Sequence, residues 1–153
     1  MSTTVTTTVD IDAPRQPVWD VLTDFATYRE WNPSVVIEGT AEVGTKLAVR
    51  MSANGKRGMT FKPKVLAATP CQELRWLGKL GFGGLIDGEH FFILTSNDDG
   101  TTRLTHGETF SGILVALMSR SLNKPGSVEQ NQKGYETFSQ VIKQRVEALR
   151  DMR

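Results

Sequence analysis

The sequence has one cysteine and no long hydrophobic run, and each shortage excludes a class of protein. A single cysteine, Cys71, cannot form an intrachain disulfide, which fits a reducing compartment. The longest apolar run, GILVALM at 112–118, is far too short to cross a bilayer. The first residues, MSTTVTTTVDIDAP, lack the basic and apolar segments of a signal peptide. We therefore expect a cytoplasmic protein without stable membrane insertion.

The chain also lacks a strong charge of either sign. Its 18 Lys and Arg residues nearly balance 17 Asp and Glu residues, and no long basic run is present, so we expect no nucleic-acid partner. Neither a phosphate-binding glycine loop nor a G-x-S-x-G motif occurs, which argues against nucleotide-binding and hydrolase folds. The 153 residues suit one domain spanning 1–153. A domain of this size can bury enough surface to be stable without a disulfide or a structural metal. We expect no cofactor.

What the sequence does contain is an orderly succession of elements. Threonine and valine at 3–11 favour a strand, and Pro14 and Pro17 place the start of a helix near residues 15–17. A run of alternating segments follows without a helix between them, which is typical of an antiparallel meander. Pro63 predicts an edge or a bulge there. A long final helix is predicted from Ser127, with an apolar stripe along one face.

Both histidines lie in one predicted hairpin, residues 88–112. If Asp98-Asp99-Gly100 forms a three-residue loop, the paired residue numbers sum to 198. His90 then lies opposite Glu108, and His106 lies on the same face because side chains alternate along a strand. Three interpretations remain open: Glu108 accepts a hydrogen bond at a cavity wall, the three residues anchor a ligand, or they form a catalytic or metal site.

Three segments carry a resemblance to a known family. They are VDIDAPRQPVWDVLTDFATYREWNP, ELRWLGKLGFGGLIDGEHFF and GTTRLTHGETFSG. They resemble the SRPBCC superfamily, and most closely its START-like branch of polyketide cyclases, dehydrases and lipid-transport proteins. The resemblance implies an α+β helix-grip fold. In that fold a curved, seven-stranded antiparallel sheet wraps around the long C-terminal helix, two short helices follow the first strand, and a cavity lies between sheet and helix.

The function that we expect is binding of a small hydrophobic ligand, such as a lipid, an isoprenoid or a polyketide-like aromatic. His90, His106 and Glu108 would be polar anchors. The predicted ligand-binding residues are Trp31, Phe61, Trp76, His90, Phe92, His106, Glu108, Phe110, Asn131 and Phe138. The resemblance places Trp31 near the cavity mouth, although packing of this side chain under the sheet is an equal alternative. No residue is predicted to be catalytic or to bind a metal.

Two other functions stay open at this point. One is a polyketide cyclase or aromatase in which a His/Glu pair moves protons. The other is a co-chaperone-like partner-binding module, for which the apolar segment 113–122 is the candidate surface. A homodimer is also left open.

Two glycine features add detail. Gly134 interrupts the final helix, so either a strand approaches closely there or space is kept for a ligand. The glycine-rich stretch 78–88 suits a lid over a hydrophobic entrance.

Overall fold

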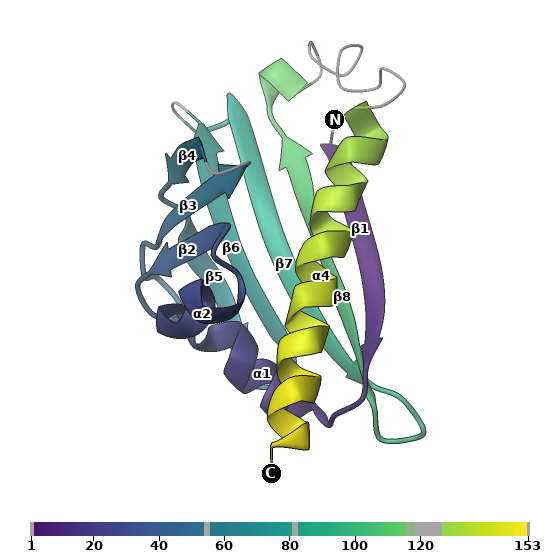
Figure 1. Cartoon of the computed structure of the whole chain (residues 1–153). Coiled ribbons are helices and arrows are strands. Elements are labelled where there is room, and N and C mark those ends of the chain that lie inside the picture. The colour runs from purple at the N-terminus through teal and green to yellow at the C-terminus, as the bar shows by residue number, and fades with distance from the viewer. Residues whose placement is uncertain (1, 54–55, 81–82, 116, 118–126, 153) are drawn as a thin grey trace.

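The elements follow the predicted order, in a computed structural model that describes residues 2–53, 56–80, 83–115, 117 and 127–152 (Figure 1). After β1 (Ser2–Ile11) come α1 (Arg15–Thr23), a 3-10 turn η1 (Phe25–Thr27) and α2 (Tyr28–Trp31). The strands that follow are β2 (Val35–Glu38), β3 (Ala48–Ala53), β4 (Lys56–Phe61), β5 (Lys64–Thr69), β6 (Glu73–Leu80), β7 (Ile86–Ser96) and β8 (Thr102–Ser111). The last helix is α4 (Ser127–Asp151).

Every strand pairing between these elements is antiparallel, but the expected seven-stranded sheet is not what forms. Within the described residues, the strands divide into a five-stranded sheet, in the order β1-β8-β7-β6-β5, and a three-stranded sheet, β2-β3-β4. The α+β helix-grip prediction is confirmed, whereas the prediction of seven strands in one sheet is wrong.

Pro63 explains the division. It lies between β4 and β5, where its missing N–H cannot continue a ladder. Its carbonyl instead accepts a hydrogen bond of 2.8 Å from the backbone of Leu47, and Lys46 forms an isolated bridge with Lys64. The two sheets therefore remain neighbours through these contacts. The edge or bulge predicted here is found, because β4 and β5 are both edge strands and the register of β5 shifts between Val65 and Ala67.

The start of α1 is where the prolines predicted it. Pro14 is the extended residue before Arg15, and Pro17 lies in the first turn, where no intrahelical N–H bond is required. The helix then buries Val18, Trp19, Val21 and Leu22 against the core.

The β7–β8 hairpin has the predicted register. His90 pairs with Glu108 and Phe92 with His106, so paired numbers sum to 198 along the hairpin. At the turn, Asn97 N–H donates to the carbonyl of Thr101, and Gly100 adopts a φ of +85°. Glycine is favoured at that position because the left-handed region is strained for other residues.

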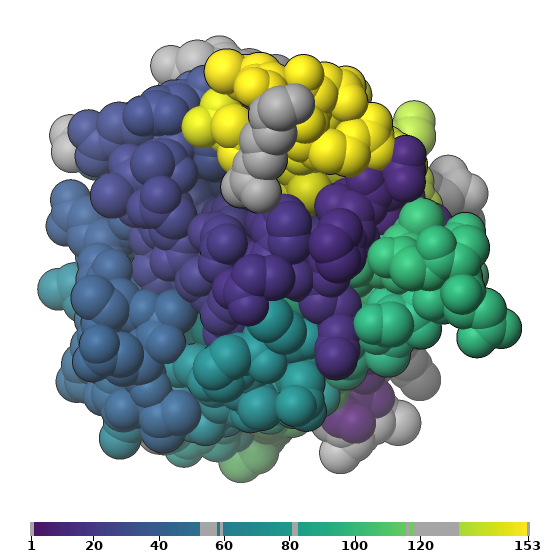
Figure 2. Space-filling view, turned by 90° about the horizontal axis from the view of Figure 1, so that it is seen from below, coloured from purple at the N-terminus to yellow at the C-terminus, as the bar shows by residue number. Residues whose placement is uncertain are grey.

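Helix α4 covers the concave face of the five-stranded sheet from its β1 edge. It packs mainly along β1 and α1, as Figure 1 shows, and buries Ile142 and Val146 completely or nearly so. Seen from below, its C-terminal end lies directly against the N-terminal segment, while the 97–101 loop projects at the side (Figure 2). No helix in the described ranges is long and apolar enough to cross a bilayer.

Two glycine predictions can be compared with this arrangement. A Cβ built on Gly134 meets no described atom within 4 Å, so the close strand approach that we considered is wrong. Strands β6 and β7 pair as far as Leu80 and Ile86. The ends of the glycine-rich stretch 78–88 therefore belong to the two strands. Residues 81–82 of the expected lid lie outside the described residues, and the lid stays a prediction.

Candidate functional site

A chain of polar side chains crosses the concave face at mid-height of β7 and β8. His90 Nδ1 lies 3.5 Å from Glu108 Oε2, and His90 Nε2 lies 2.7 Å from His106 Nε2. His90 comes from β7, and the other two residues come from β8, as the hairpin register requires. The structure therefore brings together the three residues that the sequence placed on one face.

Helix α4 completes the chain at both ends. The Tyr135 hydroxyl donates to Glu108 Oε2 at 2.5 Å, and Ser139 Oγ lies 3.1 Å from His106 Nδ1. Tyr135 and Ser139 are four residues apart and therefore share one helix face. The resulting order is Tyr135–Glu108–His90–His106–Ser139, which we call the polar chain.

Burial sets the charges in the polar chain. His106 is only 1% exposed, and burial, together with the nearby His90, holds the pKa of His106 well below 6.5. For Glu108, burial would raise the pKa, but hydrogen bonds and charge from His90 and the Tyr135 hydroxyl outweigh it, so the pKa is lowered. Burial and the Glu108 charge raise the pKa of Tyr135. At neutral pH the chain thus contains a neutral His106, a carboxylate and a phenol.

Aromatic rings enclose the two imidazoles. Trp76 stacks on His90 with centroids 5.0 Å apart, and Phe92 stacks on His106 with centroids 4.5 Å apart. Phe138 of α4 packs against His106 at 5.1 Å. These predicted wall residues fix the orientation of the rings and exclude water from the inner end of the polar chain.

The imidazole geometry is that of a hydrogen bond. Two nitrogens bound to one zinc lie about 3.3 Å apart, given Zn–N distances of about 2.0–2.1 Å, whereas the two Nε2 atoms are 2.7 Å apart. Within the described residues, no group of three or more His, Cys, Asp or Glu side chains is arranged to hold a metal ion.

Burial along the concave face decreases toward the open end. Leu104 and Phe92 are fully buried, while the side chains of His90 and Glu108 are 16% and 22% exposed. Two residues further along β8, Phe110 is also only partly buried. The polar chain therefore runs from the packed core at Ser139 to a partly exposed end at Glu108.

The carboxylate lies directly over the backbone of the neighbouring strand. A Cβ built on Gly88 would fall 2.5 Å from Glu108 Oε1, so glycine at this position makes room for the carboxylate. Tyr135 bonds to the other oxygen, Oε2. Among the described residues, Oε1 receives no hydrogen bond.

Trp31 packs against the hydrophobic core and has one polar atom without a partner among the described residues. Its ring lies 4.6 Å from that of Tyr28, against the hydrophobic core. Its indole Nε1 is buried and finds no hydrogen-bond partner among the described residues. An unpaired buried donor is costly, so this atom is a candidate contact for a ligand acceptor.

The remaining predicted residues are spread more widely. Phe61 lies in β4, opposite Val49, and is 37% exposed. Met51, in the adjacent strand β3, is 50% exposed. The backbone of Asn131 belongs to α4, but its side chain lies outside the described residues.

Sequence reasoning missed Tyr135, Ser139 and Gly88 as members of the site. The first two could have been found, because Tyr135 and Ser139 flank Phe138 on the face of the final helix that meets the sheet. Gly88 could have been found from its pairing with Phe110, two positions from the His90–Glu108 pair.

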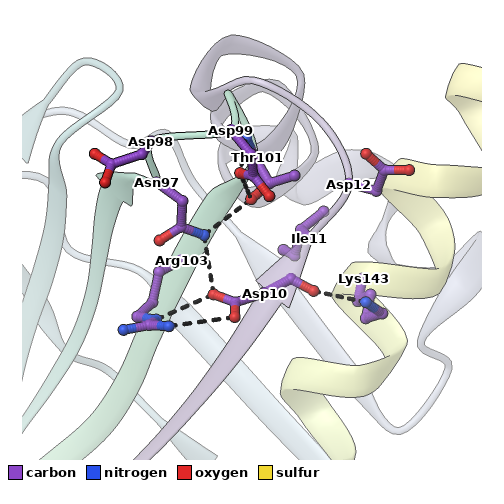
Figure 3. A pocket seen from close by; sticks show the side chains of 9 residues that line it. All are labelled: Asp10, Ile11, Asp12, Asn97, Asp98, Asp99, Thr101, Arg103 and Lys143. Carbon is purple, nitrogen blue, oxygen red and sulfur yellow. Dashed lines mark hydrogen bonds and ion pairs between the residues drawn. The ribbon is translucent and has the colours of Figure 1, made fainter.

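Away from the polar chain, a polar hollow of about 580 Å³ lies beside the β7–β8 turn, where β1 ends (Figure 3). Arg103 and Asn97 hydrogen-bond to Asp10 and lower its pKa, and Lys143 Nζ donates to the Asp10 backbone oxygen. Asp10 and Arg103 thus form an ion pair within the hollow. This hollow does not match the hydrophobic site that the sequence predicts.

Solved structures with this fold bear out the architecture. A START superfamily protein from Mycobacterium smegmatis has 20% identity and a TM-score of 0.69, covering 95% of this chain and 98% of that chain. The Zhui aromatase/cyclase from Streptomyces sp. R1128 has 16% identity and a TM-score of 0.69, with coverage of 96% and 94%. A norcoclaurine synthase from Thalictrum flavum, in complex with a transition-state analogue, has 12% identity and a TM-score of 0.70, with coverage of 98% and 97%.

Sequence comparison is consistent with these folds. A search of curated protein sequences finds no significant match. A family profile described as polyketide cyclase / dehydrase and lipid transport matches residues 2–147. The match spans every strand and all but the end of the last helix. The chain therefore belongs to the polyketide cyclase / dehydrase and lipid-transport family.

Proposed function

We propose that the protein binds a small hydrophobic ligand on the concave face, with its polar end at Glu108 and His90. The observation that carries this proposal is a partly exposed carboxylate–histidine pair on an otherwise apolar face. Small-molecule sites typically combine apolar walls with a few polar groups that fix orientation. Each Å² of apolar ligand surface removed from water contributes about 25 cal/mol to binding.

The walls would come from two directions. Phe110 and Trp76 line the sheet side, and Phe138 lines the helix side next to the polar chain. Phe61 and Met51 supply exposed apolar surface from the smaller sheet. Trp31 would donate its free indole N–H to a ligand oxygen.

Binding of the neutral probe N-phenyl-1-naphthylamine, followed by fluorescence, tests this proposal. Phe110→Asp places a charge on the concave face and should weaken probe binding at least tenfold. Thr109→Asp is the matched control, because the neighbouring residue of β8 points to the opposite face. We expect it to change probe binding less than twofold. Failure of the wild type to bind the probe, or equal effects of the two substitutions, would overturn the proposal.

A cyclase or aromatase activity is the second candidate, and the His90–Glu108 pair is the observation that favours it. A histidine paired with a carboxylate can act as a general base, and the Tyr135 hydroxyl holds that carboxylate in place by donating a hydrogen bond to it. The distinguishing result is a Glu108→Gln variant that binds the neutral probe normally but no longer turns over a β-diketone test substrate.

A further inference from the structure

The charge of the polar chain is unbalanced at its exposed end. Among the residues that the structure describes, the ionisable groups in contact with the Glu108 carboxylate are His90 and Tyr135. Within the described part of the chain, no Lys or Arg side chain forms an ion pair with it. The ion pairs that described basic residues form lie elsewhere: Arg75 with Glu73 and Glu89, Arg103 with Asp10, Lys143 with Glu147, Arg145 with Glu30, and Arg150 with Asp12 and Asp151.

The unpaired negative charge of Glu108 should distinguish ligands whose polar end is neutral from ligands whose polar end is negatively charged. A ligand hydroxyl can donate directly to Glu108 Oε1, the oxygen that lies over Gly88. A ligand carboxylate at the same place would bring two negative charges together in a poorly solvated site. Two such groups cannot both stay ionised at close range unless a positive charge joins them.

His90 is placed to supply that positive charge. When His90 is neutral and donates from Nδ1 to Glu108, its Nε2 is an acceptor, so His106 must donate from its own Nε2. His106 Nδ1 then accepts from the Ser139 hydroxyl. All hydrogen bonds of the polar chain point toward Glu108 in this state.

Adding one proton to His90 reverses the direction of the hydrogen bonds from His90 through His106 to Ser139. His90 Nε2 becomes a donor, His106 changes tautomer and carries its proton on Nδ1, and Ser139 Oγ accepts it. The backbone carbonyl of Tyr135 also favours a proton on His106. The displaced Ser139 hydroxyl can donate to the carbonyl four residues earlier, a common helical bond. Each group is satisfied in both states without movement of heavy atoms.

The other described groups that face His90 and Glu108 are not ionisable. Trp76 of β6 stacks on His90, and Val5 and Thr7 of β1 pair with Glu108 and His106. Within the described part of the chain, the charge of the site is therefore carried by the polar chain itself.

We propose that Glu108 and His90 make the concave site selective for the charge of a ligand's polar end. A neutral hydroxyl binds directly, and a carboxylate binds only with one proton, which is taken up from solvent at His90. This inference rests on the proposed hydrophobic-ligand function.

Decan-1-ol and decanoate test the proposal, because they share one chain and differ at the polar end. In calorimetry with buffers of different ionisation enthalpy, wild-type protein at pH 7.5 should take up close to one proton with decanoate and none with decan-1-ol. Decanoate affinity should fall by up to tenfold per pH unit as pH rises above 7.5, since one proton is linked to binding. Decan-1-ol affinity should stay constant.

The two histidines make the location of the proton directly visible. With ¹⁵N-labelled histidine, NMR should report a neutral His90 and an Nε2–H tautomer of His106 in the free protein. Decanoate should convert His90 to imidazolium and His106 to the Nδ1–H tautomer, whereas decan-1-ol should leave both unchanged. Proton uptake with unchanged histidine signals would overturn the assignment to His90.

Glu108→Gln should raise decanoate affinity about tenfold and abolish proton uptake. Glu89→Gln is the control, because Glu89 lies next to His90 in β7 but pairs with Arg75 on the opposite face. If both probes bind wild type equally at every pH, this inference fails and the proposed function stands. If neither probe binds, both fail. The wild-type pH series and NMR decide the question even if Glu108→Gln does not fold.

Discussion

His106 is a buried base, and its burial connects the site to the stability of the fold. Its imidazole is enclosed by Phe92 and Phe138 and held by Ser139 and His90. Such a group is kept neutral by the fold, whereas in the unfolded chain it titrates in the ordinary histidine range.

The free energy of unfolding should therefore fall as pH drops below about 6.5. There the unfolded chain binds a proton at residue 106 and the folded chain does not, so acid favours unfolding by up to about 1.4 kcal/mol per pH unit. Urea unfolding at pH 7.5, 6.0 and 5.0 measures this slope above the range of most carboxylates. His106→Gln should lower stability at pH 7.5 but flatten the slope. If the free energy of unfolding of His106→Gln depends on pH as steeply as that of the wild type, His106 is not the cause of the pH dependence.

The two tyrosines of the chain should respond differently to loss of their hydroxyls. Tyr28 is fully buried and donates to the Leu22 carbonyl, so Tyr28→Phe should lower the free energy of unfolding by about 1–3 kcal/mol.

Tyr135→Phe removes a donor from Glu108, so the pKa of that carboxyl should rise and the pH dependence of decanoate binding should move to higher pH. Urea titration and calorimetry measure the two effects. If both variants change stability and the pH dependence of decanoate binding to the same extent, the two hydroxyls do not have separate roles in the core and in the site.

At the scale of elements, the β1–β8 pairing depends on a close approach at one glycine. A Cβ on Gly107 would lie 2.2 Å from the Val5 carbonyl oxygen and 2.8 Å from the Phe91 ring. The first contact is with the backbone of β1, which cannot move without disturbing the ladder on which α4 rests.

Gly107→Ala and Gly134→Ala should consequently act in opposite directions. The first should lower the free energy of unfolding by about 1–3 kcal/mol or more, because β1 must shift. The second should raise it by about 0.5–1 kcal/mol, because an exposed helical glycine gains helix propensity when replaced by alanine and no described atom obstructs the new Cβ. Both values come from urea titration. A neutral Gly107→Ala would show that the two strands are further apart than described.

At the scale of the whole molecule, α4 joins the sheet to the N-terminal helices. Ile142 is fully buried between them, and polar contacts with Asp10, Asp12 and Glu30 surround that core. Shortening an apolar side chain at this contact should therefore destabilise the sheet and the helices together.

Ile142→Ala should lower the free energy of unfolding by about 2–5 kcal/mol, the usual cost of a cavity at a buried isoleucine. Gln140→Ala, on an exposed position of the same helix, should change it by less than about 0.5 kcal/mol. Far-ultraviolet and near-ultraviolet circular dichroism should report one shared transition for each protein. Separate transitions for helix and sheet would show that α4 does not join them.

Local patterns in the sequence determined much of this molecule. The prolines positioned the start of α1, and the loop Asp98-Asp99-Gly100 specified the hairpin register, which in turn placed His90, His106 and Glu108 on one face. These features depend on backbone restrictions and on the alternation of side chains, which act over a few residues.

Only the tertiary structure decided how those pieces meet. The packing of α4 against the β1 edge depends on contacts between residues far apart in the chain. The same packing brings Tyr135 and Ser139 to the two ends of the polar chain, a juxtaposition that no local pattern contains. The charge of Glu108 and the neutrality of His106 likewise follow from burial and from partners on another element, because solvation and electrostatic contacts are properties of the assembled fold.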